Sequence, residues 1–162
     1  MTRSLKKKLA KTLNTSYTNY MDEYLFMGKT FALWRRRVGQ ALMPFGITFH
    51  QFCLVRLARR MGSLNLSAAA SELGMDKPTL SLVAFKCVKQ GWLRRISVVK
   101  DKRSTRLGLT GEGEELLDRI DAARIFAPES MGDALDVLDS EERAALRRML
   151  DKVSRRAKDI FV

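Results

Sequence analysis

The sequence predicts a mainly α-helical fold that carries one small β-hairpin. Three observations predict it. Apolar residues recur at helical spacing through the first 60 residues and again from residue 110 to the C-terminus. Between these regions the helical segments become short, and glycines separate them. After Gly91 the helical spacing gives way to two short stretches that are typical of strands.

The N-terminal part is predicted to be helical on both sides of a turn. A basic leader, residues 5–27, has leucines and then tyrosines at helical spacing. A helix over 29–43 follows it and ends at Pro44-Phe45-Gly46, because proline and glycine interrupt helices. Residues 48–61 form the next predicted helix, with Thr48 as its N-cap.

Two short helices are predicted in the middle of the chain. Ser67 is expected to cap a helix over 68–73, which Gly74 ends. Asp76 is expected to cap the second, which tolerates Pro78 in its first turn and runs to about residue 90. Two short helices joined through a glycine turn have the form of a helix-turn-helix.

Residues 92–99 and 105–109 are predicted to be strands, joined by the polar tip 100–103. A hairpin placed directly after a helix-turn-helix is a wing. Thr110 is then expected to start a further helix, and Asp139 with Glu142 forms a capping-box pattern at the start of the last one.

The charge is large and uneven. The 162 residues carry a formal net charge of +12, divided as +10 over residues 1–60, +6 over 61–110 and −4 over 111–162. One interpretation of the basic charge over residues 1–110 is a polyanionic partner, of which nucleic acid is the commonest. The other is that the chain is simply a basic protein with an ordinary charged surface. The leader 5–27 is accordingly either an arm that touches DNA phosphates or a partner subunit, or a partly ordered basic tail.

Several classes of protein are disfavoured. The chain has one histidine and two cysteines without metal-ligand spacing, so we expect no metal and no cofactor. It lacks a glycine-rich phosphate loop and a paired nucleophile and base, which argues against an enzyme. Residues 38–55 are uncharged, but Pro44-Phe45-Gly46 interrupts them and we expect no membrane span. No signal peptide is evident, and a reduced, cytoplasmic setting is expected.

Residues 64–116 resemble the MarR family of winged helix-turn-helix transcriptional regulators. The motifs that carry the resemblance are Asp101-Lys102-Arg103-Ser104 followed by Leu107-Gly108-Leu109-Thr110-Gly111-Glu112-Gly113, preceded by Leu66-Ser67-Ala68-Ala69-Ala70-Ser71-Glu72-Leu73 and by Gly91-Trp92-Leu93-Arg94-Arg95. Each is weak alone; together, in this order and spacing, they are fairly specific.

The resemblance implies a homodimer that binds double-stranded DNA at a pseudo-palindromic operator in a bacterial or archaeal cell, on the nucleoid. It implies a repressor, often one that a small ligand or an oxidant releases. It implies a recognition helix in the major groove and a wing in the minor groove. The expected organisation is a basic extension (1–28), helices that support the dimer and the core (29–62), the winged helix-turn-helix (63–110) and C-terminal dimerisation helices (111–162).

The second short helix is the expected recognition helix. A stripe of Leu80, Val83, Ala84 and Cys87 should pack inward. The candidate DNA-binding residues are then Lys77, Thr79, Ser81, Leu82, Lys86 and Lys89. Leu82 and Phe85 leave two interpretations open: they contact thymine methyl groups, or the helix is rotated so that both are buried.

The candidate wing residues are Lys100, Asp101, Lys102, Arg103 and Ser104. Arg103 suits a narrow minor groove, and the resemblance implies that Asp101 holds it by a salt bridge. The interpretation without DNA is an ordinary charged hairpin tip.

A hydrophobic or aromatic ligand could occupy a pocket formed by Trp34, Met43, Phe45, Phe49 and His50. Such residues at helical spacing are also typical of core packing. Cys53 and Cys87 are expected to be buried structural thiols and not redox sensors. The rival function is a winged-helix module that binds proteins without sequence-specific DNA binding.

Overall fold

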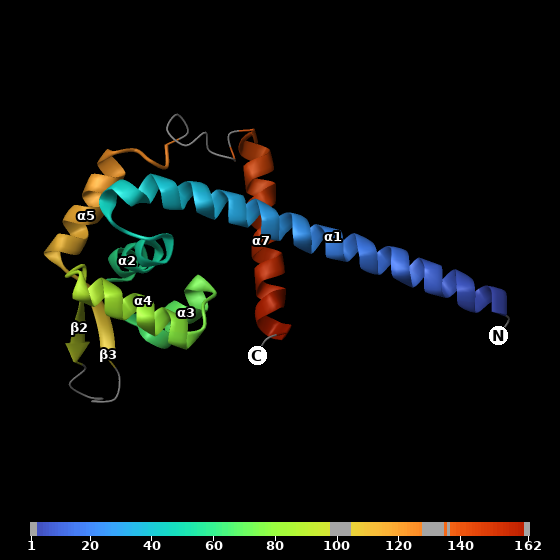
Figure 1. Ribbon diagram of the computed structural model, residues 1–162, viewed down its shortest axis with the longest axis horizontal. Helices are drawn as coiled ribbons and strands as arrows, with labels where there is room; N and C mark the ends of the chain where they lie inside the picture. Colours follow the sequence, from blue (N-terminus) through green and yellow to red (C-terminus); the bar gives the residue numbers. More distant parts are fainter. Residues whose placement is uncertain (1–2, 98–104, 128–134, 136, 161–162) are drawn as a thin grey trace. The chain divides into compact units, whose positions relative to one another are not determined.

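The structure is a computed structural model that describes residues 3–97, 105–127, 135 and 137–160. The chain divides into two compact units, Met1–Phe49 and His50–Val162. Most of the described elements are helices, and three are short strands. Figure 1 labels the helices and the strands β2 and β3.

The first unit is one long helix followed by a short turn. Helix α1 runs without a break from Arg3 to Leu42, so the leader and the helix expected over 29–43 are a single helix (Figure 1). The 3₁₀ turn η1, Met43–Phe45, follows, and Gly46 ends it in the left-handed conformation with φ 68°. The predicted stop at Pro44-Phe45-Gly46 is confirmed. Gly28 does not interrupt α1, because a lone helical glycine costs only about 1 kcal/mol.

The second unit holds the remaining elements. In chain order they are α2 (Phe49–Met61), β1 (Ser63–Asn65), α3 (Leu66–Leu73), α4 (Lys77–Lys89), β2 (Leu93–Ser97), β3 (Thr105–Leu109), α5 (Gly111–Ala122) and α7 (Ser140–Ile160). Phe49, the first residue of α2, belongs to the first unit. The expected helix-turn-helix and the two expected strands are therefore present.

The three strands form one antiparallel sheet in the order β1-β3-β2. Leu107 of β3 pairs with Leu64 on one side and with Arg95 on the other. Leu64, Leu93 and Leu107 are buried, so each strand contributes a leucine to the core. Strand β1 was not expected from the sequence, because three residues are too few to show alternation.

Most predicted helix caps are confirmed. The Oγ1 of Thr110 accepts from the backbone N–H of Gly113 at 3.1 Å. At the start of α7, Asp139 and Glu142 exchange side chain–backbone hydrogen bonds of 2.9 Å each, the reciprocal pattern of a capping box.

One cap prediction is wrong. Helix α3 begins at Leu66, and Asn65, not Ser67, is its N-cap. The Oδ1 of Asn65 accepts from the backbone N–H groups of Ser67 at 2.8 Å and of Ala68 at 3.4 Å. Because β1 ends at Asn65, this residue keeps the extended backbone that an N-cap needs, whereas Ser67 is already helical.

The core of the second unit gathers aliphatic side chains from α2, α4 and α5. Leu54, Leu80, Leu116, Leu117 and Ile120 are all fully buried.

Within the described residues no single helix is long and apolar enough to cross a membrane. The segments Met21–Phe45 and Phe49–Met61 meet such a criterion only as a bent pair, by length and composition.

Candidate nucleic-acid interface

Helix α4 is held in place at both ends by local hydrogen bonds. Asp76 is its N-cap: one carboxylate oxygen accepts from the backbone N–H of Thr79 at 2.8 Å, and this hydrogen bond lowers the pKa of Asp76. Pro78 lies in the first turn, where its missing N–H is harmless. After the helix the chain turns at Gly91 with φ 79°, a left-handed conformation that favours glycine. The expected cap and stop are both confirmed.

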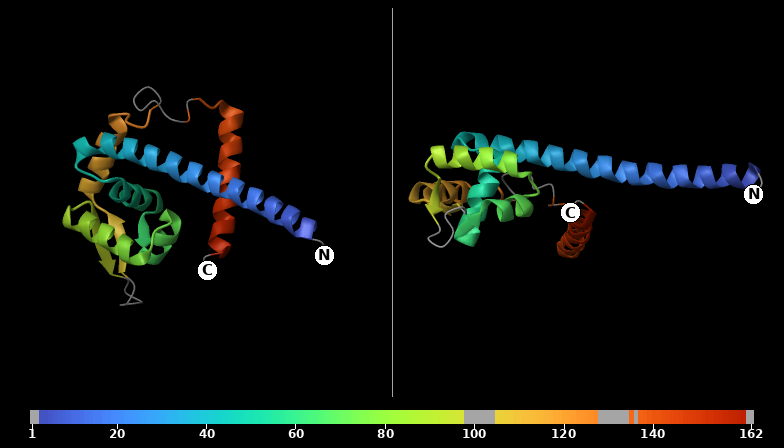
Figure 2. Two further views of the ribbon diagram at one scale, coloured as in Figure 1. Left: turned by 45° about the vertical axis from the view of Figure 1, so that its right-hand side comes forward. Right: turned by 90° about the horizontal axis from the view of Figure 1, so that it is seen from below.

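Helix α3 contacts α4, and α4 contacts β2. The connection between the helices passes through Gly74, whose φ of 61° also requires the left-handed region. Figures 1 and 2 show the three elements side by side, with the hairpin strands next to α4. This is the arrangement of a helix-turn-helix followed by a wing.

The inward face of α4 is the one expected. Leu80, Ala84 and Cys87 are buried and Val83 is half-buried. Leu82 and Phe85 are 56% and 54% exposed. The alternative interpretation, in which a rotated helix buries both, is therefore wrong.

All the polar residues proposed on this helix are exposed. The set consists of Lys77, Thr79, Ser81, Lys86 and Lys89. None of its three lysines forms an ion pair with another described residue. Cations left without a carboxylate partner are available to phosphate oxygens.

The wing has described strands, while the predicted wing residues Lys100, Asp101, Lys102, Arg103 and Ser104 lie outside the described residues. On the strands, Arg94, Arg95 and Arg106 are exposed. The guanidinium of Arg106 donates to the hydroxyl of Ser63 on β1 at 3.1 Å. These three arginines add positive charge to the hairpin and were not among the predicted DNA-binding residues. The sequence feature that could have identified them is their position on the two predicted strands that flank the basic segment 100–103.

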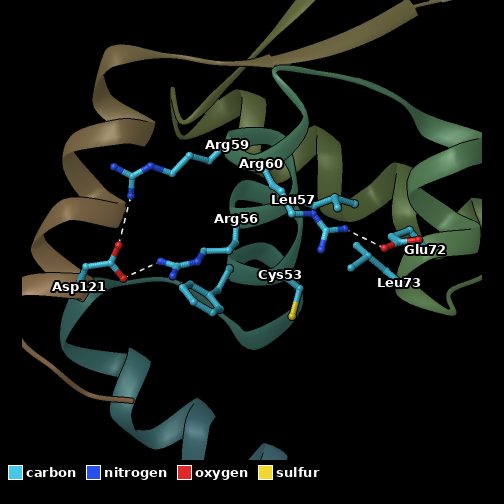
Figure 3. A pocket seen from close by; sticks show the side chains of 9 residues that line it. Cys53, Arg56, Leu57, Arg59, Arg60, Glu72, Leu73 and Asp121 are labelled. Carbon is cyan, nitrogen blue, oxygen red and sulfur yellow. Dashed lines mark hydrogen bonds and ion pairs between the residues drawn. The ribbon is translucent and has the colours of Figure 1, made fainter. Parts of the chain in front are cut away.

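Behind the helix-turn-helix, α2 presents three arginines to carboxylates of α5 and α3 (Figure 3). Arg59 is the centre of this cluster. Its guanidinium pairs with Glu114 at 2.9 Å, with Asp121 at 3.2 Å and with Asp118. The hydrogen bond with Asp118, more than any other interaction, raises the pKa of Arg59.

The other two arginines complete the cluster. Arg56 pairs with Asp121 at 2.5 Å, and Arg60 pairs with Glu72 of α3 at 2.7 Å. Each exposed pair is worth little alone, but several charges in one network hold their elements together better. The cluster therefore links α2, which contributes core residues, to α3 and α5, the helices before and after α4.

A hollow of about 650 Å³ lies beside this cluster. Figure 3 shows Cys53 and the arginines around it, with Leu73 on the α3 side. Its lining residues are Phe52, Cys53, Arg56, Leu57, Arg59, Arg60, Glu72, Leu73 and Asp121. None of the five predicted ligand-pocket residues is among them.

Four of those five residues belong to the first unit, and His50 begins the second. The rings of Trp34 and Phe49 meet edge to face with centroids 5.5 Å apart. Phe45 is half-buried, whereas Met43 is 72% exposed. A ligand site at these residues stays a prediction.

The two cysteines are withdrawn from solvent to different extents. Burial raises the pKa of Cys53 to about 11 and that of Cys87 to about 12. Thiols with such values are protonated near neutral pH and react slowly. Full burial, as expected, holds for Cys87, whereas Cys53 is half-buried.

Comparison with known proteins agrees with this arrangement. The model of the MarR family matches residues 47–105. The HTH-type transcriptional regulator PecS of Dickeya dadantii (strain 3937) is 26% identical over 123 residues, covering 74% of this chain and 72% of PecS. The HTH-type transcriptional regulator YhbI of Bacillus subtilis (strain 168) is 30% identical over 117 residues, covering 72% of this chain and 73% of YhbI.

A solved structure shares the fold. A mutant MarR from E. coli, crystallised with operator DNA, superposes with a TM-score of 0.71 at 22% identity. The match covers 79% of this chain and 90% of that one. The likeness extends beyond the hairpin and the two short helices to most of the chain.

Proposed function

This chain belongs to the MarR family of DNA-binding transcriptional regulators, and we propose that it binds a pseudo-palindromic operator as a homodimer and represses transcription there. The observation that carries the proposal is the outward face of α4. It holds exposed lysines and hydroxyls and no carboxylate, next to strands that expose three more arginines.

In the proposed complex α4 lies in the major groove, whose width of about 12 Å admits an α-helix. Lys77, Lys86 and Lys89 neutralise phosphates, and the hydroxyls of Thr79 and Ser81 reach phosphates or base edges. The wing places Arg103 in the minor groove, where Asp101 orients its guanidinium. The lysines supply affinity that depends on salt, since each neutralised phosphate releases counterions.

The proposed dimer is supported by the two terminal helices. Helices α1 and α7 expose large apolar side chains: Tyr24, Leu25, Phe26, Phe31 and Leu33 on α1, and Met149, Leu150 and Val153 on α7. A second copy of the chain would bury such faces. Two recognition helices related by a twofold axis would read an inverted repeat with half-sites about one helical turn apart.

A repressor of this kind acts by occupying DNA and needs no catalytic step. We place it with the chromosome in the cytoplasm of a bacterial or archaeal cell. The rival proposal is a winged-helix module that binds other proteins, for which the exposed apolar side chains of α4 would serve as the contact. The basic surface around those side chains favours DNA.

The test is selection of bound sequences from a random duplex library at near-physiological salt, with the intact chain. We expect an inverted repeat to be enriched, and Arg103→Ala to abolish the enrichment. Lys152→Ala is the charge-matched control, since it removes one positive charge from α7 and should leave the enriched sequence unchanged.

Two results would overturn the proposal. One is the absence of any enriched sequence. The other is binding that ignores sequence and persists in Arg103→Ala. Either would move the assignment to a basic protein-interaction module.

A further inference from the structure

We propose that Leu82 and Phe85 recognise the C5-methyl groups of thymines in the major groove, so that each operator half-site contains thymines whose methyl groups contribute to binding. This inference rests on the proposed function, because it requires α4 to lie in the groove. It adds which chemical feature of the bases this particular helix reads.

The helix geometry directs both side chains outward. With 3.6 residues per turn, Leu82 lies about 200° around the axis from the fully buried Leu80, and Phe85 about 140°. The two are three residues apart, which makes them neighbours on one face. Since each is more than half exposed, they form an apolar pair at the centre of the outward face.

Cations and hydroxyls surround this pair. Lys86 and Lys89 lie on the same outward face, and Thr79 lies one turn before Leu82. A groove of DNA matches such a surface, because its edges are lined by phosphates and its floor presents base edges. A protein partner with an apolar cleft would instead remove water from the flanking lysine ammonium groups without offering them an anionic partner.

The composition of α4 limits what else could read the bases. Between Lys77 and Lys89 there is no arginine, asparagine or glutamine, and no acidic residue. The usual bidentate contacts with guanine from arginine, and with adenine from asparagine or glutamine, are therefore unavailable to this helix. Lysine can reach guanine, and the apolar pair can reach thymine, the only base of normal DNA with a methyl group in the major groove.

The expected effect follows from burial of one methyl group. Such a contact is worth about fourfold in affinity, the equivalent of one buried CH₂. A dimer makes the contact once in each half-site, so loss of a symmetry-related pair of methyl groups should weaken binding about 16-fold.

The test compares thymine with uracil, which forms the same base pair but lacks the methyl group. The intact chain is first used to recover its preferred duplex from a random library. That duplex is then synthesised with uracil at single symmetry-related thymine pairs, and Kd is measured at fixed salt for each. We expect one or two thymine pairs at which uracil weakens binding about 16-fold, while the others have little effect.

Variants assign the effect to the two side chains. In Leu82→Ala and Phe85→Ala the thymine duplex should bind more weakly, and the ratio of Kd between uracil and thymine should fall toward one at the pair that each side chain contacts. Alanine is the best helix former and both positions are exposed, so folding should be preserved. Circular dichroism and thermal unfolding check this.

Lys86→Ala is the matched control on the same face. It should weaken binding of both duplexes equally and reduce the slope of log K against log salt by about 1.8, since each of the two subunits loses one phosphate contact, while the ratio of Kd between uracil and thymine remains. If uracil binds as well as thymine at every position, the inference is overturned and the proposed function stands. It is also overturned if the ratio survives in both alanine variants. If no duplex is enriched at all, the proposed function and this inference fail together.

Discussion

Gly113 is the position at which a single methyl group should test how closely α5 packs against the turn that follows α4. It is the third residue of α5 and is buried, and its backbone N–H donates to the capping hydroxyl of Thr110. A Cβ added there would meet the backbone carbonyl oxygen of Trp92, well inside the 3.0 Å that real Cβ atoms keep. It would also lie 2.6 Å from Cδ1 of Leu109. Because the first of these atoms belongs to the backbone, α5 itself must shift away from the turn between α4 and β2.

The size of the effect comes from two opposing contributions. Replacing glycine by alanine within a helix stabilises by up to about 1 kcal/mol, and overpacking a buried site destabilises by about 1–3 kcal/mol. Gly111, at the start of the same helix, has nothing within 4 Å of an added Cβ and is exposed. Gly111→Ala therefore measures the first contribution without the second. We expect Gly113→Ala to be less stable than Gly111→Ala by about 1–3 kcal/mol.

The assay is urea unfolding of both variants and the parent chain at one protein concentration, since the stability of a dimer depends on concentration. Operator affinity should also fall in Gly113→Ala, because the turn at Trp92 leads from α4 into the wing. If Gly113→Ala is as stable as Gly111→Ala, the close approach between α5 and this turn does not exist and the reasoning is refuted.

Three further outcomes are expected. Asn65→Ala should lower the free energy of unfolding by about 1 kcal/mol, whereas Ser67→Ala should change it little; equal effects would contradict the assignment of the cap. Arg59→Gln should destabilise by about 1 kcal/mol, measured by urea unfolding, and less at high salt; a loss independent of salt would argue against the ion-pair network. Cys53 and Cys87 should be alkylated slowly by iodoacetamide at pH 8 and quickly after unfolding. Fast alkylation of the folded chain would refute the shielding. Because folding raises the pKa of both thiols, the protonated thiols contribute stability below about pH 9, and this contribution is lost as the pH rises to about 11–12.

Local chemistry explains how much of the fold was predictable. The capping hydrogen bonds of Asp76, Thr110 and Asp139 each reach a backbone N–H only three residues away, so the sequence alone indicates where α4, α5 and α7 begin. The glycine that ends α3 acts through its own backbone conformation and is equally local. The order of two short helices and a hairpin followed from these signals.

For the candidate site, the inward stripe of α4 was predictable from its period, because one face of a helix must be apolar to pack. The sequence by itself thus determined most of the elements, the caps of α4, α5 and α7, and the basic character of the outward face of α4.

Tertiary contacts decided the rest. Arg59 finds Asp118 and Asp121 across 59 and 62 residues of sequence, and no local pattern ranks those partners above other carboxylates. Strand β1 exists because β3 pairs with it, and its end fixes Asn65 as a cap. The exposure of Leu82 and Phe85 likewise depended on the rotation of α4 about its axis. Long-range packing sets that rotation, since a helix with apolar residues on both sides satisfies its own hydrogen bonds equally well in either orientation.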